Sequence, residues 1–572
     1  MTAPDREPWW TTAVGYQVYP RSFADSDGDG IGDLRGLLGR LDHLVELGVD
    51  VVWLSPVYPS PQHDNGYDIS DYEDVDPVFG SLSDLDELIA ALHDRGMRLV
   101  MDLVVNHTSD EHPWFTASRS SREDPKRDWY WWRPPRPGAV PGTPGAEPTN
   151  WGSMFSGPAW TFDEASGEYY LHLFARQQPD LNWENPEVRA AVYEMMRWWL
   201  DRGVDGFRMD VINLISKDPS LPDGVVRDGQ VHGDGSPYFF CGPRIHEYLQ
   251  EMHREVLTGR EGLLTIGEMP GVSVEQAVLF TDPTRNELDM VFQFEHVGVD
   301  QGGTKWEVQA FDLRRLKASL GRWQTGLAER GWNTLYWNNH DQPRVVSRFG
   351  DDGEHRVRSA TMLATVLHLH RGTPFVYQGE ELGMTNVPLA GPEDLHDVES
   401  RNHYRTAVVD GGADPEQVMA AIRAMGRDNA RSPVQWDTSP HAGFTTGEPW
   451  MPVHPGFPEV NAEAARADPG SVFHHYRRLI ALRHDERVVA HGDFTLLLPD
   501  HEHVYAFTRR LDEVKLLVLG NFSGSTLTVD LPGWSGCEVL LRNLPEAYAP
   551  GGELVLAPWE ARVHRRAVRA SG

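Results

Sequence analysis

Hydrophobic and polar positions follow one repeating order along most of the chain. An amphipathic stretch with helical spacing is followed by a glycine and then by a short apolar run that ends in polar residues. The clearest example joins PEVRAAVYEMMRWWLDRG, residues 186–203, to VDGFRMD, residues 204–210. Because proline suits the first turn of a helix and glycine its end, this unit predicts a helix followed by a strand.

The same unit recurs from one end of the chain to the other. The predicted strands are 14–20, 49–55, 97–107, 204–210, 263–268, 290–295, 333–341 and 373–381. The predicted helices are 34–47, 84–95, 186–203, 244–257, 313–330, 355–371 and 472–483. This alternation is typical of an α/β fold with a parallel sheet, and eight such units can close into a (β/α)8 TIM barrel. An open doubly wound sheet is the alternative, because alternation alone does not show closure.

Two regions depart from the alternation. Residues 109–169 contain the Pro- and Gly-rich sequence WRPPRPGAVPGTPGAEP after the third predicted strand, and this stretch is too long for an ordinary connection. Beyond about residue 490, short alternating runs such as HVYAFTRR, VKLLVLGNF and GELVLAP are typical of antiparallel strands. We therefore predict a barrel formed by 1–108 and 170–486, an inserted subdomain B at 109–169, and a C-terminal β-sandwich at 487–572.

Composition and charge exclude several classes of partner. The 572-residue chain has a formal net charge of −33, which disfavours nucleic acid and anionic membranes because both are themselves negative. No run approaches the roughly 20 apolar residues that cross a bilayer, and the start, MTAPDREPWW, lacks a basic segment followed by an apolar one. Cys241 and Cys537 lie far apart and imply no disulfide framework. We expect a cytoplasmic protein, either a monomer or a weak homo-oligomer.

Acidic side chains stand at the carboxyl ends of several predicted strands. In a barrel these ends converge on one face, so Asp210, Glu268 and Asp341 are expected to share a pocket. Like charges held close together raise each other's pKa and reduce stability unless they are paired or used. A single acid at a strand end usually caps the next helix, but three acids on three strands are typical of catalysis.

Two carboxyl groups that flank a bond are what glycoside hydrolysis requires. One attacks the anomeric carbon, and the other protonates the departing oxygen and later activates water. Arg208 lies two residues before Asp210 on the same face of its strand, so it is placed to hold that nucleophile ionised. Glu268 follows the apolar run LLTIG, a setting that raises the pKa of a carboxyl group and suits the acid.

Several segments resemble the signature sequences of glycoside hydrolase family thirteen, the α-amylase family. They are DLVVNH, GFRMDVIN, GEMP and NNHDQPR, which occur in this order along the chain. Two further segments, QPDLNW at 178–183 and RDNARSPVQW at 427–436, are similar to the oligo-1,6-glucosidase and α-glucosidase branch. The resemblance extends over nearly the whole chain and implies a barrel, an insertion after the third strand and a β domain at the end.

The resemblance also implies a role for each matching position. It makes Asp210 the nucleophile, Glu268 the general acid/base, and Asp341 the third carboxylate, which grips sugar hydroxyls and stabilises the transition state. It places the terminal glucose, the end of a small oligosaccharide substrate, among Asp68, Tyr67, His107, Arg208, His340 and Arg427, with Tyr67 as the stacking aromatic. The alternative for these supporting residues is a structural role, in which a His or Arg at a strand end only donates a hydrogen bond to a buried backbone carbonyl.

Val211 follows the nucleophile and is expected near the leaving-group side of the bond. In enzymes that resemble this chain, Val at this place accompanies a preference for α-1,6 bonds, whereas Thr or Ala accompanies α-1,4 bonds. We therefore expect a retaining, exo-acting α-glucosidase that prefers isomaltose and isomalto-oligosaccharides to maltose. An α-1,4-glucosidase stays open, because Val is also a common strand residue.

The Gly-rich loop DSDGDGIGD, residues 25–33, alternates Asp with small residues. Its carboxylates suit a hard cation, although the loop is no standard EF-hand because Gly36 stands where Glu is required. The resemblance implies a structural Ca²⁺ or Mg²⁺ away from the chemistry, and an Asx-rich turn without metal is the alternative. The expected ligands are Asp25, Asp27, Asp29, Asp33 and the carbonyl of Ile31. No GxGxxG follows the first strand, so we expect no organic cofactor.

Other functions share this pattern. Sucrose isomerases and trehalose synthases form the same glycosyl-enzyme intermediate but transfer the sugar to another sugar, and residues around the nucleophile do not separate the two outcomes. Trehalose-6-phosphate hydrolysis would need phosphate-binding cations that the sequence does not identify. Transporter-associated glycoproteins carry a membrane span and lack catalytic acids, and a purely carbohydrate-binding protein would leave Asp210 and Glu268 without a role.

Overall fold

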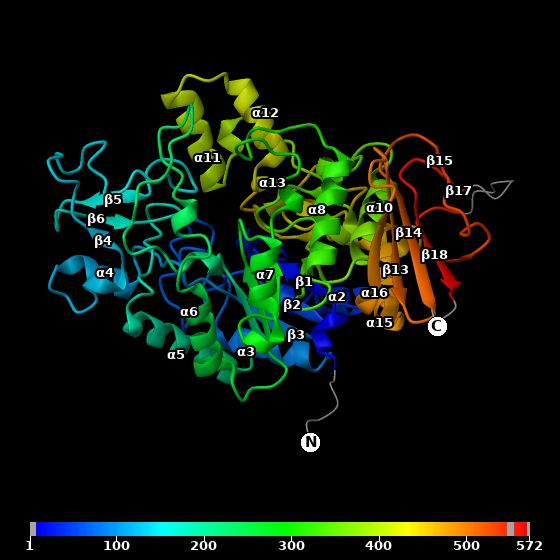
Figure 1. Cartoon of the computed structure of the whole chain (residues 1–572), viewed down its shortest axis with the longest axis horizontal. Helices are drawn as coiled ribbons and strands as arrows, with labels where there is room; N and C mark the ends of the chain where they lie inside the picture. The colour runs from blue at the N-terminus through cyan, green and yellow to red at the C-terminus, as the bar shows by residue number, and fades with distance from the viewer. Residues whose placement is uncertain (1–6, 546–553, 569–572) are drawn as a thin grey trace.

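Eight short parallel strands form the centre of the computed structural model, which describes residues 7–545 and 554–568 (Figure 1). The strand order is β10-β11-β1-β2-β3-β7-β8-β9, and a parallel bridge between Val291 and Asn333 brings β9 next to the start of β10. The sheet therefore closes on itself, and the predicted (β/α)8 barrel is confirmed. The strands are β1 (Gly15–Val18), β2 (Val51–Leu54), β3 (Arg98–Leu103), β7 (Gly206–Met209), β8 (Leu264–Glu268), β9 (Met290–Phe292), β10 (Thr334–Leu335) and β11 (Thr373–Tyr377).

The interior of the barrel is packed with large side chains. Trp53, Phe292 and Phe375 are almost fully buried, and their rings lie 5.1 to 6.3 Å apart between centroids. A parallel sheet covered by helices is buried on both faces, which explains why the strands are nearly continuous apolar runs. Because the interior is filled, a ligand can enter only at the ends of the strands.

Helices surround the barrel mostly where the periodicity predicts them. The stretch 34–47 breaks into two helices around Gly39, and 244–257 changes from an α-helix into the π-helix η6 (His253–Leu257). Helix α7 (Val274–Thr281) was not predicted, although Ser273 and Gln276 form its capping box. The other main helices are α1 (Leu34–Leu38), α2 (Leu41–Leu47), α3 (Leu82–His93), α5 (Pro186–Arg202), α6 (Ile245–Met252), α8 (Leu313–Gly326), α10 (Arg356–His368) and α15 (Val472–Asp485).

Shorter helices were also missed by the periodicity, because most of them lie within long connections. They are α4 (Pro113–Ser120), α9 (Val345–Phe349), α11 (Val398–Tyr404), α12 (Pro415–Met425), α13 (Asp428–Arg431), α14 (Ala462–Ala467) and α16 (Arg487–His491). Helices α11 and α12 stand above the barrel at the top of Figure 1, and the π-helix η11 (Arg405–Asp410) follows α11 directly. Of these helices, α11 reaches the face on which the strand ends open.

The segment between β3 and β7 carries a small antiparallel sheet at the left of Figure 1. Its strands run in the order β4-β6-β5. Strand β6, the last of the three in the sequence, ends at Leu171, two residues beyond the predicted limit of 169. The strands are β4 (Trp132–Arg133), β5 (Trp160–Asp163) and β6 (Glu168–Leu171). Aromatic rings dominate this segment, which lies beside the carboxyl ends of the barrel strands.

The C-terminal region consists of a five-stranded antiparallel sheet and a two-stranded one. Apolar side chains between the two sheets include Val504, Leu519, Val529 and Leu556, all buried. The first two residues of the run GELVLAP, and the first six of the chain, lie outside the described residues. The strands are β12 (Asp493–Leu497), β13 (Val504–Leu511), β14 (Val514–Asn521), β15 (Leu527–Val529), β16 (Glu538–Arg542), β17 (Leu554–Leu556) and β18 (Ala561–Ala567).

Apolar helices of membrane-spanning length do not occur in the part of the chain that the structure describes.

Gly206 permits a close approach of two barrel strands. It begins β7 at a φ of +149°, and a Cβ atom at this position would lie 1.9 Å from the carbonyl oxygen of Leu264 on β8. A side chain here must therefore push the backbones apart or distort β7. Arg208 lies on the same strand, and Asp210 follows the last residue of that strand. The placement of both side chains therefore depends on this contact.

Gly206→Ala is expected to lower the free energy of unfolding by about 2 to 3 kcal/mol, because it combines a backbone clash with a disfavoured φ. Urea denaturation measures this loss. Gly96→Ala is the matched control, since Gly96 has a φ of +76° but no atom within 4 Å of the added Cβ. That control should lose about 1 kcal/mol. Equal losses in the two variants would show that the β7–β8 approach imposes no requirement of its own.

Candidate active site

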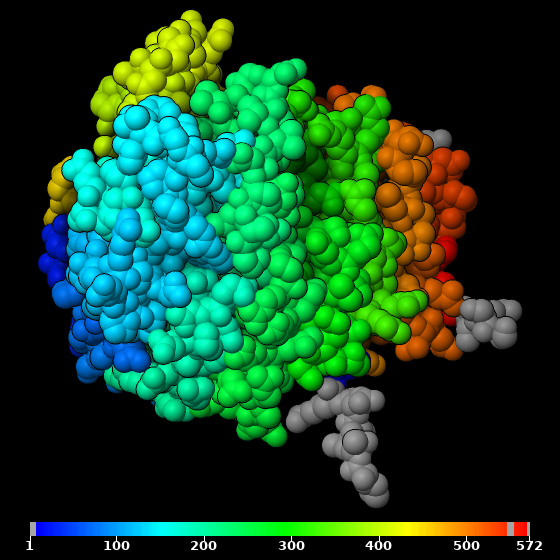
Figure 2. Space-filling view, turned by 60° about the vertical axis from the view of Figure 1, so that its left-hand side comes forward, coloured from blue at the N-terminus to red at the C-terminus, as the bar shows by residue number. Residues whose placement is uncertain are grey.

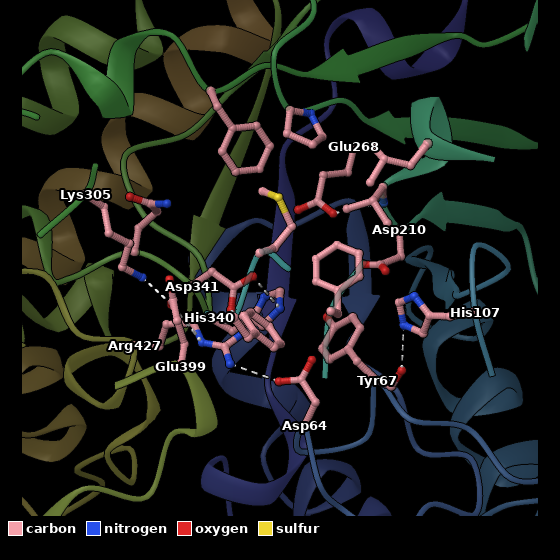
Figure 3. Close-up of a pocket in the computed structure, with 18 residues that line it drawn as sticks. Asp64, Tyr67, His107, Asp210, Glu268, Lys305, His340, Asp341, Glu399 and Arg427 are labelled. Atoms are coloured by element: carbon pink, nitrogen blue, oxygen red, sulfur yellow. Dashed lines mark hydrogen bonds and ion pairs between the residues drawn. The ribbon is translucent and has the colours of Figure 1, made fainter. Parts of the chain in front are cut away.

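One pocket opens at the carboxyl ends of β3, β7, β8 and β10 (Figure 3). It encloses about 190 Å³, less than the roughly 300 to 1,000 Å³ of pockets for drug-sized ligands, so it suits a single sugar-sized ring. The structure brings together most of the residues that the sequence singled out. Those that line the pocket are Asp210, Glu268, Asp341, Tyr67, His107, His340, Arg427 and Val211.

Arg208 lies beneath the pocket and is shared by three carboxylates. Its Nη1 donates to Asp210 Oδ1 at 2.8 Å and to Asp102 Oδ1 at 2.6 Å, while its Nη2 contacts Glu268 Oε1. The side chain is 1 % exposed and is not among the residues that line the pocket, so the contact of Arg208 with the sugar stays a prediction. Its position is that of a buried cation that fixes the two reacting carboxyl groups from below.

Asp102 anchors the far side of this guanidinium. Its Oδ2 accepts hydrogen bonds from Trp53 Nε1 at 2.8 Å and from the Tyr67 hydroxyl at 3.1 Å. The Trp53 ring also lies 4.8 Å from the carbon of the Arg208 guanidinium, a cation–π contact. Asp102 and Trp53 contact Arg208 directly, and Tyr67 holds Asp102 in place. These three side chains therefore fix the orientation of the guanidinium, in addition to its contacts with Asp210 and Glu268.

The two reacting carboxyl groups share a raised affinity for protons. Burial and the charge of Glu268 raise the pKa of Asp210 well above its ordinary value, although Arg208 opposes the shift. Burial likewise raises the pKa of Glu268. If all three carboxylates around Arg208 were ionised, one cation would face three anions, so the Asp210–Glu268 pair retains a proton. Asp102 also contacts this guanidinium, so only part of the Arg208 charge offsets the repulsion between Asp210 and Glu268.

Val211 connects the nucleophile's strand to Glu268 through its backbone. Its N–H donates to Glu268 Oε2 at 3.1 Å, and its φ is +36°, in the left-handed region. This conformation is rare for a β-branched residue and costs about 1 to 3 kcal/mol, which the surrounding packing must offset. The strained turn therefore orients the carboxyl group of Glu268 while the Val211 side chain lines the pocket.

Asp341 lies across the pocket from Asp210 (Figure 3), and two arginines hold its carboxylate. Arg427 Nη1 donates to its Oδ1 at 3.2 Å, and Arg431 Nη2 donates to the same atom at 2.9 Å. Burial works to raise the pKa of Asp341, but the charges of His340 and of both arginines lower it below its ordinary value. Since burial lowers the pKa of His340 to about 3, the arginines keep Asp341 ionised at neutral pH.

Two stacked rings form part of the pocket wall. Tyr67 lies parallel to His340 with ring centroids 4.9 Å apart and an interplanar angle of 4°. His340 Nδ1 accepts from Gln17 Nε2 at 2.9 Å, so the proton of the neutral ring sits on Nε2, 3.4 Å from Asp341 Oδ2. His107 is also neutral, with a pKa lowered to about 4 by burial, and its Nε2 donates to the Tyr67 carbonyl at 3.0 Å.

Asp64, and not Asp68, faces the pocket. Asp64 Oδ1 accepts from Arg427 Nη2 at 2.9 Å, and its burial raises its pKa to about 6. The fully buried Asp68 carboxylate accepts instead from the backbone N–H groups of His63 at 2.8 Å and Asp64 at 3.0 Å. Asp68, which was predicted to contact the terminal glucose, therefore does not line the pocket, and its hydrogen bonds shape the loop that presents Asp64.

A buried lysine ties the loops around the site together. Lys217 Nζ is within 2.9 Å of both Asp180 Oδ2 and Asn106 Oδ1, and within 3.0 Å of the Leu214 carbonyl. The Asn106 amide also donates to Asp180 at 3.0 Å and contacts His107 Nδ1 at 3.3 Å. The ammonium thus joins the end of β3 to the turn after β7. Sequence reasoning missed Lys217, which lies just beyond the segment GFRMDVIN that contains Asp210.

Part of the pocket lining comes from residues that do not stand directly at a strand end. Lys305, in the loop after β9, forms an ion pair with Glu399 on α11 (Figure 3). Next to this pair, Trp306 stacks on His403 at 4.4 Å with an interplanar angle of 6°. Two contacts therefore tie the loop to α11. Neither contact has a signal in the local sequence pattern.

The Asp-rich loop brings three of its four aspartates together. Asp25, Asp27 and Asp29 each offer an oxygen, and these atoms lie within 4.8 Å of one another. Burial, followed by the charges of Asp27 and Asp25, raises the pKa of Asp29. Asp33 turns away to cap α1, and the Ile31 N–H donates to Asp29 Oδ1 at 2.7 Å. The cluster fits a hard cation through three carboxylates.

Comparisons with known proteins cover nearly the whole chain. Residues 17–492 match the family model "Alpha amylase, catalytic domain", and residues 504–563 match "Alpha-amylase SusG C-terminal domain". The oligo-1,6-glucosidase of Parageobacillus thermoglucosidasius is 55% identical over 562 residues, which are 97% of this chain and 99% of that protein.

Two solved structures illustrate the same similarity. The trehalose-6-phosphate hydrolase of Bacillus licheniformis superposes with a TM-score of 0.91 and 46% identity, covering 98% of this chain and 100% of the other. The trehalulose synthase MutB of Pseudomonas mesoacidophila MX-45 gives a TM-score of 0.92 and 43% identity over the same shares.

Lys217→Met is expected to lower the free energy of unfolding by about 3 to 5 kcal/mol, because it leaves the buried Asp180 carboxylate without its cation. Urea denaturation provides the measurement. The double variant Lys217→Met/Asp180→Asn is the control and should recover part of the loss, since the unpaired charge is then gone. A loss below about 1 kcal/mol in the single variant would contradict this account.

Proposed function

This chain belongs to the α-amylase family of glycoside hydrolases, and from that membership we propose that it is a retaining, exo-acting α-glucosidase. In this proposal it releases glucose from the non-reducing end of short α-1,6-linked sugars such as isomaltose. The observation that carries the proposal is the placement of Asp210 and Glu268 on one buried guanidinium, with Asp341 facing them across a ring-sized pocket.

The chemistry proceeds through a covalent intermediate. Asp210 attacks the anomeric carbon while Glu268 donates its proton to the glycosidic oxygen, so that the bond between this carbon and oxygen breaks and the aglycone leaves. Glu268, now ionised, takes a proton from water, whose oxygen attacks the same carbon and releases Asp210. Because one guanidinium contacts both carboxyl groups, they lie near each other, which favours the separation of about 5 to 5.5 Å in retaining enzymes.

The shared proton suits the first step. Sugar binding beside Asp210 places the proton of the pair on Glu268, the group that faces the leaving oxygen. Arg208 stays charged throughout, since contacts with Asp102, Glu268 and Asp210 raise its pKa against the effect of burial. Asp341 stays ionised between Arg427 and Arg431 and can accept hydrogen bonds from sugar hydroxyls.

The walls of the pocket support exo action on short substrates. Its volume suits one ring, and the ion pair of Lys305 with Glu399 lies at its mouth. Tyr67 presents an aromatic face, and Asp64 and Arg427 present polar groups to the same space. A ring at the end of a chain can enter such a pocket, whereas the interior of a long polymer cannot pass through it.

The α-1,6 preference is supported by Val211 and by the relatives. Val211 lines the pocket next to Glu268, on the side where the leaving group must lie. The curated relative at 55% identity is named an oligo-1,6-glucosidase. Transfer of the sugar to another sugar is the second candidate, because the trehalulose synthase shares the fold at 43% identity.

We further propose that Asp25, Asp27 and Asp29 hold a structural Ca²⁺ or Mg²⁺. The three oxygens form a charged face whose mutual repulsion a divalent cation would remove, and the loop lies against residues 445–450 instead of the catalytic pocket. A cytoplasmic location and a monomeric or weakly associating state stay predictions from the sequence.

Initial rates on isomaltose, maltose, trehalose and sucrose, with analysis of the products, test the activity. Glucose release is expected to be fastest from isomaltose, and Asp210→Asn should reduce kcat by on the order of 10⁴-fold because the nucleophile is lost. Asp289→Asn is the matched control, since Asp289 is a half-buried carboxyl group that accepts hydrogen bonds from Thr265 outside the catalytic pocket. It should retain activity.

Faster cleavage of maltose would refute the linkage, and isomerised sucrose would favour transfer. Full activity of Asp210→Asn would refute the mechanism.

Removal of the cation tests the metal proposal. Dialysis against a chelator is expected to lower the melting temperature, and added Ca²⁺ or Mg²⁺ should restore it. Metal content is measured by mass spectrometry before and after dialysis. Asp27→Asn/Asp29→Asn should melt at the same temperature with and without chelator. An unchanged melting temperature of the natural chain, with no bound metal, would exclude the site.

A further inference from the structure

A second hollow lies beside the catalytic pocket, between the inserted segment and α11. It has two adjoining parts of about 510 and 520 Å³, which share Gln177, Asn402 and Arg405 among their lining residues. The first part also shares Phe155 and Phe174 with the catalytic pocket, so these rings separate the two spaces. Figure 2 shows the two segments at the same edge of the molecule, the inserted one in cyan and α11 with α12 in yellow. We call this hollow the arginine cleft.

The charge of the arginine cleft is opposite to that of the protein as a whole. Arg176, Arg401 and Arg405 line it together with histidines, and none of its described lining residues is acidic. The chain nevertheless has 85 Asp and Glu against 52 Lys and Arg. Where carboxylates are this abundant, a space whose charged lining residues are all arginines is a local exception that favours an anionic ligand.

The three arginines also lack partners. Within the described part of the chain, none of their side chains makes an ion pair, a hydrogen bond or a ring contact. Other arginines that surround the catalytic pocket are fully engaged, as Arg427 shows with Asp64, Asp341 and Asp397. Arg405 lines both parts of the cleft, with Arg176 in one part and Arg401 in the other, so an anion bound there would lie near at least two guanidinium groups.

We propose that the arginine cleft binds a phosphate group, either as inorganic phosphate or as the phosphate of a phosphorylated sugar. Arg401 and Arg405 would hold it from α11 and η11, and Arg176 from the inserted segment. Phosphate fits better than a carboxylate because its charge of about −1.5 to −2 and its three acceptor oxygens match several planar guanidinium forks. Each part of the cleft exceeds the size of one phosphate group, and Gln177 and Asn402 can bind hydroxyl groups of an attached sugar.

The arginine cleft contacts the catalytic pocket through Phe155. Asn402 Nδ2 on α11 donates to the Phe155 carbonyl at 3.2 Å, and the ring of Phe155 lies 4.8 Å from the Arg427 guanidinium carbon. A ligand that joins α11 to the inserted segment would hold Phe155 in the pocket wall. The proposal does not depend on the proposed function, since the cleft contains none of the reacting groups.

Isothermal titration calorimetry of the full chain at constant ionic strength tests the proposal, with inorganic phosphate and glucose 6-phosphate as the two probes. The natural chain is expected to give saturable binding of at least one of them. Arg401→Gln/Arg405→Gln should weaken it at least about tenfold, since each arginine lost removes charge-assisted hydrogen bonds. Arg358→Gln/Arg477→Gln is the matched control, because these exposed arginines also lack partners but lie outside the cleft.

The control removes the same charge, so a weakening confined to the cleft variant places the phosphate there. Tighter binding of glucose 6-phosphate would assign a phosphorylated sugar, and equal or weaker binding would assign free phosphate. Arg176→Gln alters the opposite wall and should weaken binding as well; it decides the matter if the double variant does not fold. No saturable binding of either probe, or unchanged affinity in the cleft variants, would overturn the proposal.

Discussion

The guanidinium of Arg208 is the constraint on which the catalytic site depends. It is buried and contacts Asp102, Asp210 and Glu268 at once, so neither the cation nor the acids could be buried there without the others. Uncompensated charges in such a setting carry penalties of several kcal/mol each. With three anions on one cation, the group as a whole favours retaining a proton, and in the proposed mechanism this is the proton that Glu268 donates and later regains.

The barrel supplies this arrangement through its strand register. Asp102 on β3 and Arg208 on β7 are direct cross-strand partners, and Arg208 is paired in turn with Ile266, two residues before Glu268 on β8. Parallel strands in this register direct alternate side chains to the same face, so the ion pairs follow from the pairing of the strands. The fold and the charge cluster therefore stabilise the same geometry.

Local sequence patterns predicted the parts of the molecule that depend on local rules. Periodicity located the barrel strands, and their ends identified Asp210, Glu268, Asp341, His107 and His340, because a side chain after a buried strand has one face on which to emerge. The patterns were less informative where contacts beyond the local sequence determine how far a strand extends or which way a side chain points. The stretch 333–341 forms only the two-residue strand β10, since Asn339 turns the chain by accepting a hydrogen bond from the Asp341 N–H.

Hydrogen bonds within loops, and contacts between segments far apart in the sequence, account for the remaining differences between prediction and structure. Asp64 and Asp68 flank the same tyrosine, and only the hydrogen bonds of their loop decide which one faces the pocket. Lys305 and Glu399 come from a loop and a helix that meet in space, far apart in the sequence.

Val211, in its left-handed turn, has two separate roles, one for its backbone and one for its side chain. Its backbone N–H, which any amino acid except proline supplies, holds Glu268, while its side chain borders the space for the departing group. Substitution at this position can therefore change which bonds are admitted while the proton donor stays in place, so related enzymes can diverge in selectivity without rebuilding their chemistry.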